Sequence, residues 1–122
     1  MALSGSLVIT NNTGGTIGLT QASPVNDDPT FSVNPSVPSR IENGGTIEVH
    51  MANDSVFFAP RGVGCSITFM NGDFEQGGVY LSIPAVGAHT LNGYNPPGKT
   101  VYTYAFGNPG GGNSYTASVT KA

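Results

Sequence analysis

The stretch Gly45-Thr46-Ile47-Glu48-Val49-His50-Met51 alternates small or polar residues with apolar ones throughout its length. Successive side chains of a β-strand point to opposite faces, so Ile47, Val49 and Met51 share one apolar face. The stretch from Ser114 to Val119 repeats this period of two. A strand with one apolar and one polar face is typical of an antiparallel sheet that covers a core on one side.

Turn residues interrupt this pattern every 8 to 12 positions or so, the spacing expected of a β-sandwich or barrel. Asn-Gly and Gly-Gly pairs supply residues that tolerate positive φ, and we expect the pair Gly77-Gly78 to be a hairpin or bulge position. Residues 24–38 hold four prolines and predict a surface connection or an edge element. The predicted strands are residues 3–10, 16–21, 30–33, 45–51, 55–59, 64–70, 77–83, 89–91, 99–106 and 113–120.

The composition predicts one folded domain spanning residues 1–122. Of the 122 residues, 38% are hydrophobic and 9% are charged, and the remainder is rich in Gly, Ser, Thr and Asn. We therefore predict an all-β fold, a single small antiparallel β-sandwich of nine or ten short strands. The residues expected to face inward are Ile47, Val49, Ile67, Phe69, Val101 or Tyr102, Ala117 and Val119.

Charge and motif content argue against several functions. The net charge is −3 with four scattered Lys and Arg residues, so nucleic acid is not an expected partner. His50 and His89 lie far apart in sequence without a nucleophile motif, and neither has a close partner histidine. We predict no catalytic residue, no metal ligand and no cofactor, and hence no enzyme.

The single cysteine, Cys65, cannot form an internal disulfide. It alternates with Ile67 and Phe69, which predicts a buried and unreactive thiol. Residues 1–6 lack the basic region and apolar run of a signal peptide, and no transmembrane segment is evident. We expect cytosolic synthesis with leaderless export, removal of a leader, or a place in a larger assembly or inclusion.

The aromatic residues and the loops supply the candidate binding site. Tyr102, Tyr104 and Phe106 share one strand face and are expected to serve the core. Ligands of β-sandwiches usually meet the loops at an end, and residues 93–98 and 108–113 have a suitable composition. We select Tyr94 and Asn95 as ligand-binding residues, because a Tyr near Pro96 and Pro97 loses little entropy on binding.

Three stretches resemble one protein family. They are Leu7-Val8-Ile9-Thr10-Asn11-Asn12-Thr13, Pro38-Ser39-Arg40-Ile41-Glu42-Asn43-Gly44-Gly45, and Phe106-Gly107-Asn108-Pro109 leading to Asn113-Ser114-Tyr115. In order and spacing they are similar to the aegerolysins and the related small crystal proteins of spore-forming bacteria. The resemblance implies a β-sandwich that recognises membrane lipids, in some members together with a larger pore-forming partner. The chain departs from the family by having no Trp.

Two functions follow as expectations. The first is a non-enzymatic, aegerolysin-like binding module that contacts membrane lipid or glycan and assists a pore-forming partner. The alternative is a self-assembling subunit of a capsid, filament or crystalline inclusion, a homo-oligomer in which an edge strand such as residues 3–10 pairs with a neighbouring copy.

Overall fold

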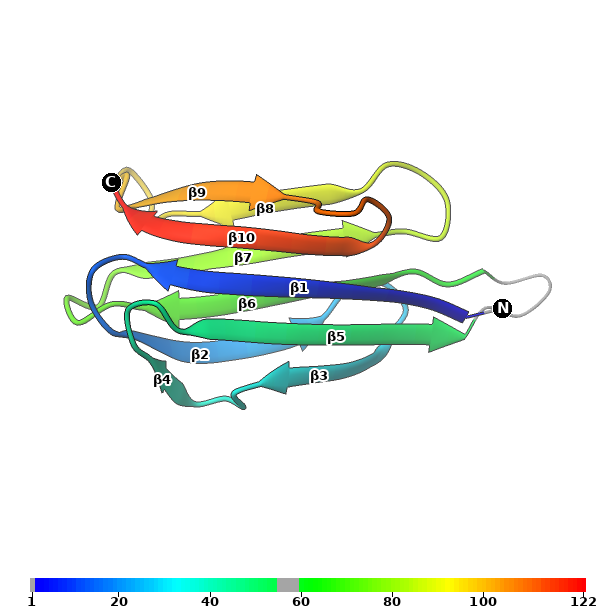
Figure 1. Cartoon of the computed structure of the whole chain (residues 1–122), viewed down its shortest axis with the longest axis horizontal. Helices are drawn as coiled ribbons and strands as arrows, with labels where there is room; N and C mark the ends of the chain where they lie inside the picture. Colours follow the sequence, from blue (N-terminus) through cyan, green and yellow to red (C-terminus); the bar gives the residue numbers. More distant parts are fainter. Residues whose placement is uncertain (1, 55–59) are drawn as a thin grey trace.

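The computed structural model describes residues 2–54 and 60–122, which form ten β-strands in two five-stranded sheets (Figure 1). The all-β sandwich predicted from the alternation is therefore confirmed. The first sheet has the order β3 (Thr30–Asn34), β5 (Thr46–Asp54), β1 (Ala2–Asn12), β10 (Ser114–Lys121), β9 (Tyr102–Gly107). The second sheet has the order β4 (Ser39–Ile41), β2 (Ile17–Pro24), β6 (Val63–Met70), β7 (Gln76–Ile83), β8 (Thr90–Tyr94). The strand predicted at residues 55–59 lies outside the described residues.

The strand β1 lies in the middle of the first sheet. It pairs antiparallel with β5 on one side and parallel with β10 on the other, and every other pairing in the described residues is antiparallel. The expectation that residues 3–10 form an edge strand open to a neighbouring copy is thus wrong, because both sides of β1 are already hydrogen-bonded within the chain. The edges are β3 and β9 in one sheet and β4 and β8 in the other.

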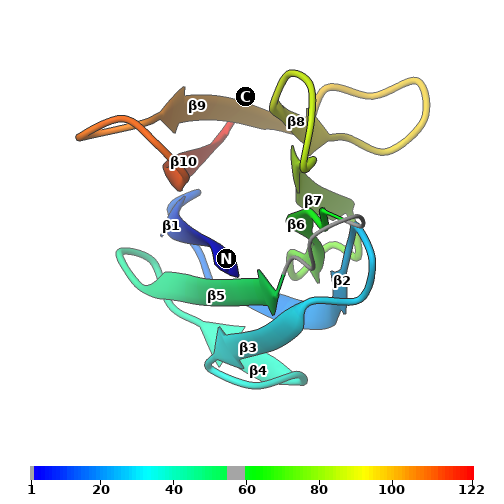
Figure 2. The ribbon, with the colours of Figure 1, turned by 90° about the vertical axis from the view of Figure 1, so that its right-hand side faces the viewer.

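The core lies between the two sheets, which face each other in the view along the strands (Figure 2). Every residue of the predicted inward-facing set is buried, and Val101 and Tyr102 are both among them. Phe106, which was expected to serve the core together with Tyr102 and Tyr104, is instead 41% exposed. Phe69 of β6 and Tyr102 of β9 meet edge to face across the core, with ring centroids 5.2 Å apart. Cys65 is fully buried beside Ile67 and Phe69 in β6, as the alternation predicted.

Two features of the second sheet differ from the sequence-based prediction. The pair Gly77-Gly78 lies inside β7 and not at a turn or bulge, because each glycine leaves room for an aromatic ring. A Cβ at Gly77 would come within 2.7 Å of the Tyr102 ring and 2.8 Å of Phe69. The strand β4 was not predicted, since it has only three residues, held by pairing with β2.

Tyr104 closes one side of the sandwich, where the edge strands β8 and β9 face each other (Figure 2). Its ring lies on Gly93 of β8, where an added Cβ would be 2.2 Å from the ring. Its hydroxyl donates to the Tyr94 carbonyl oxygen and accepts the Gly78 N–H at 3.0 Å. One side chain of the first sheet therefore holds the backbone of two strands of the second sheet.

Candidate functional site

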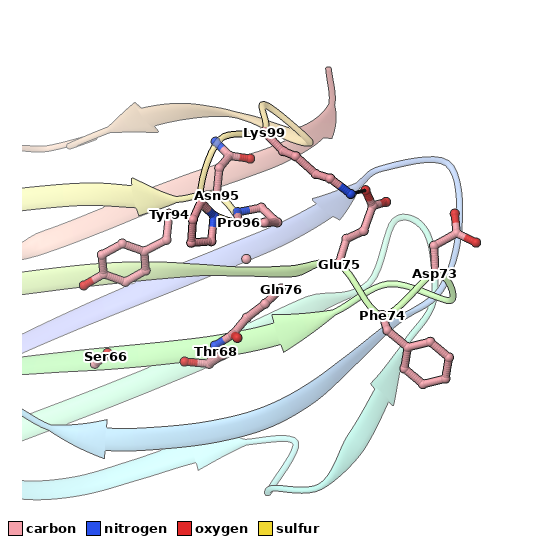
Figure 3. A pocket seen from close by; sticks show the side chains of 12 residues that line it. Ser66, Thr68, Asp73, Phe74, Glu75, Gln76, Tyr94, Asn95, Pro96 and Lys99 are labelled. Atoms are coloured by element: carbon pink, nitrogen blue, oxygen red, sulfur yellow. Dashed lines mark ion pairs between the residues drawn. The ribbon is translucent and has the colours of Figure 1, made fainter.

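An open groove crosses the outer face of the second sheet, over β6, β7 and the end of β8 (Figure 3). The alternation that turns Cys65, Ile67 and Phe69 inward turns Ser66 and Thr68 outward, and these two residues supply polar side chains to the groove. We call it the Tyr94 groove; its volume is about 610 Å³, within the usual range of ligand sites. Its lining residues are Ser66, Thr68, Asp73, Phe74, Glu75, Gln76, Gly77, Tyr94, Asn95, Pro96, Pro97 and Lys99.

Tyr94 supplies the aromatic surface of this groove. Its ring lies against Gly78, where an added Cβ would be 2.9 Å from Tyr94 Cδ2 and 2.5 Å from the Ile67 carbonyl oxygen. The side chain is 43% exposed, so one part rests on the sheet while another faces solvent. Partial burial raises the pKa of the Tyr94 hydroxyl above its ordinary value, and a hydrogen bond with Ser66 partly offsets this effect. Tyr94 is therefore a neutral phenol at physiological pH.

Asn95 lines the same groove, but its amide is engaged in holding the chain. The Asn95 Oδ1 accepts the N–H groups of Val101 and Tyr102 at 3.0 and 2.7 Å, and its Nδ2 donates to the Tyr102 carbonyl oxygen at 3.1 Å. These bonds fasten the end of β8 to the start of β9 across the Pro96-Pro97 loop. Asn95 thus holds the loop that follows Tyr94, and its contact with a ligand stays a prediction. The second candidate loop, residues 108–113, joins the other end of β9 to β10, away from the end of β8 (Figure 1).

The turn between β6 and β7 forms the rim of the groove and includes a residue that the sequence analysis did not select. Phe74 is 84% exposed and has a positive φ of 60°. Beside it, Glu75 lies 4.0 Å from the Lys99 ammonium group, an ion pair at the surface that stabilises little. The Asn71-Gly72-Asp73 sequence predicted the turn, but no sequence signal showed that the Phe following it is exposed.

Neither histidine belongs to the groove. His50 is exposed on β5 of the other sheet, and His89 Nδ1 is hydrogen-bonded to the Tyr115 hydroxyl. Within residues 2–54 and 60–122 there is no cluster of three or more His, Cys, Asp or Glu side chains arranged to hold a metal ion. The described residues also include no helix of the length and hydropathy needed to cross a bilayer.

Solved structures with the same fold are distant in sequence. IP-1A from Alcaligenes faecalis has a TM-score of 0.64 at 13% identity, over 97% of this chain and 90% of its own. The RahU protein, in complex with a Tris molecule, has a TM-score of 0.66 at 11% identity, over 98% and 95%. The wild-type Xerocomus chrysenteron lectin XCL has a TM-score of 0.55 at 11% identity, over 98% and 100%.

These matches support the β-sandwich fold that the resemblance to the aegerolysins implied. No protein-family model and no curated protein matches the chain. At such low identity the structural matches establish the fold alone.

Proposed function

We propose that this chain is a non-enzymatic module that binds a neutral glycan in the Tyr94 groove. The observation that carries the proposal is the partly exposed Tyr94 ring beside the hydroxyl groups of Ser66 and Thr68 and the amide of Gln76. A sugar ring has an apolar C–H face and a rim of hydroxyl groups. The first can pack on an aromatic face, and the second can exchange hydrogen bonds with hydroxyl and amide side chains.

The charges of the groove favour a neutral sugar over a phosphate-bearing lipid headgroup. Its acidic residues are Asp73 and Glu75, and its one cation, Lys99, lies next to Glu75. A phosphate group is ordinarily bound by Arg or Lys side chains or by backbone N–H groups at a helix N-terminus, and this all-β site lacks a cationic cluster among its lining residues. XCL, which shares this fold, is named a lectin, and this name is consistent with the proposal.

The backbone beneath the groove is held rigidly, which lowers the entropy cost of binding. The Tyr104 hydroxyl bridges Gly78 under the Tyr94 ring and the Tyr94 carbonyl oxygen. The Asn95 amide fixes the following loop. A preorganised aromatic surface gains affinity because little freedom is lost when the ligand binds.

The test is a screen of the purified chain on an array of neutral and acidic glycans, with vesicles of phosphatidylcholine, sphingomyelin and cholesterol in parallel. Hits are titrated by calorimetry with the wild type, Tyr94→Ala and Phe106→Ala. Phe106 is the matched control, because its 41% exposure is close to the 43% of Tyr94 and it lies on β9, outside the groove.

We expect neutral glycans to bind to the wild type. Tyr94→Ala should lower their affinity by at least about tenfold, while Phe106→Ala should leave it unchanged. Silence on every glycan, or binding to vesicles alone, would overturn the proposal. Unchanged affinity in a stably folded Tyr94→Ala variant would also refute the assignment of the groove.

A further inference from the structure

Phe74 combines two features that are rarely found together. The residue is 84% exposed, and its backbone has a φ of 60°. A single exposed aromatic residue is ordinary, but a bulky non-glycine residue in the left-handed region is a genuine outlier that costs free energy. Glycine or asparagine would satisfy this turn without strain. Nothing in the packing of the turn therefore explains why position 74 carries a Phe.

The turn that carries Phe74 is held by the side chains of Asn71 and Tyr102. Asn71 Oδ1 accepts the N–H groups of Asp73 and Glu75, both at 3.0 Å, and Asn71 Nδ2 donates to Glu75 Oε1 at 3.0 Å. The Phe74 N–H donates to the Asn71 carbonyl oxygen at 3.1 Å. From the core, the Tyr102 hydroxyl donates to the Glu75 carbonyl oxygen at 2.7 Å. The backbone that displays the Phe74 ring is consequently fixed before any ligand arrives.

Phe74 lines the same groove as Tyr94, at some distance along β7. Roughly 7 Å of strand separates Gly78, under the Tyr94 ring, from Gln76, and Phe74 lies beyond that point at the groove's rim (Figure 3). Phe74 also borders a second hollow of about 400 Å³, which Arg40, Glu42 and Met70 help to line. Phe74 lines both hollows, so its ring stands between them on the outer face.

From this placement we infer that the groove takes an oligosaccharide, with one sugar ring at Tyr94 and a later ring of the same chain at Phe74. The inference rests on the proposed function, and it assigns the ligand a minimum length. A single sugar ring at Tyr94 does not reach Phe74, whereas an oligosaccharide contacts both rings. Phe74 therefore contributes to affinity only for the longer ligands.

The experiment titrates the wild type and two variants with the mono-, di-, tri- and tetrasaccharides of the glucose, N-acetylglucosamine, mannose and galactose series. Phe74→Asn removes the ring but tolerates the left-handed backbone, so the turn is retained. Phe74→Tyr keeps an aromatic ring. Thermal unfolding of each variant confirms that the fold is intact.

We expect affinity in one series to rise with chain length in the wild type. We expect Phe74→Asn to leave the affinity for the monosaccharide within about twofold of the wild type and to lower the affinity for the tetrasaccharide by about tenfold. Phe74→Tyr should keep the wild-type affinity for the tetrasaccharide. Equal losses at all lengths, no loss at the tetrasaccharide, or a wild type with no dependence on length would each overturn the inference while leaving glycan binding in place. Failure of the wild type to bind any of the four series would overturn the inference, whereas only silence on the whole glycan array would remove the proposed function as well.

Discussion

Replacing Tyr104 with Phe tests the contact that closes the sandwich between β8 and β9. The change keeps the ring on Gly93 and removes only the hydroxyl. The Tyr94 carbonyl oxygen then loses a donor, and the buried Gly78 N–H loses the acceptor that lies 3.0 Å away. A net hydrogen bond contributes about 1 kcal/mol, and a buried donor left without a partner costs about 1 to 3 kcal/mol. We expect the free energy of unfolding to fall by about 2 kcal/mol at pH 7.5.

The same hydroxyl also makes a pH-dependent prediction. Burial raises the pKa of Tyr104 from 10.0 to about 12. Above pH 10 the unfolded chain loses this proton while the folded chain keeps it, so the contribution of Tyr104 to stability is complete below pH 10 and is lost as the pH rises through 12. This difference in pKa between the folded and the unfolded chain corresponds to about 2.7 kcal/mol, and solvent around the half-buried ring reduces the contribution to about 1 kcal/mol. The difference between wild type and Tyr104→Phe should therefore shrink by about 1 kcal/mol between pH 9.5 and 11.5.

The assay is urea unfolding followed by far-ultraviolet circular dichroism across this pH range. Tyr80→Phe is the matched control, since Tyr80 lies on the outer face of β7, and we expect it to stay within about 0.5 kcal/mol of the wild type. A Tyr104→Phe variant as stable as the wild type at pH 7.5 would refute the bridging role of the hydroxyl. A difference that does not change up to pH 11.5 would refute the raised pKa.

Four further predictions concern the packing of the sandwich. Phe69→Ala removes a fully buried ring that meets Tyr102 edge to face, and urea unfolding should show a loss of about 3 to 5 kcal/mol. Burial raises the pKa of Cys65 from 9.0 to about 12, so the contribution of the thiol to stability is lost as the pH rises above 9. In Cys65→Ala the free energy of unfolding should therefore begin to fall nearer pH 10. The native Cys65 thiol should also react slowly with a thiol reagent and rapidly in denaturant, and fast native labelling would place it at the surface. Gly93→Ala forces a methyl group into the Tyr104 ring and should lower the free energy of unfolding by about 3 kcal/mol. Retention of wild-type stability would show that the contact between β8 and β9 can repack.

The candidate site could be predicted only in part. The composition of residues 93–98 selected Tyr94 as a candidate, because a Tyr beside prolines and small residues is a local feature of the sequence. The same reasoning selected Asn95, whose amide is instead bonded to the backbone of Val101 and Tyr102. Phe74 was missed because its exposure depends on a left-handed backbone held by Asn71, and a Phe in a β-rich sequence ordinarily indicates core.

The sequence by itself determined which face is buried in the strands with the clearest alternation. A period of two is a property of the chain alone, and it placed Ile47, Val49, Ile67 and Phe69 in the core before any strand had a neighbour. Only the tertiary structure decided which strands are neighbours: β1 became central by pairing with β10, more than a hundred residues later in the chain. It also decided the role of Gly77 and Gly78, because the rings that need their space, Tyr102 and Tyr94, come from strands that only folding brings together. Local alternation is read within a few residues, whereas pairing and close packing depend on contacts between distant parts of the chain.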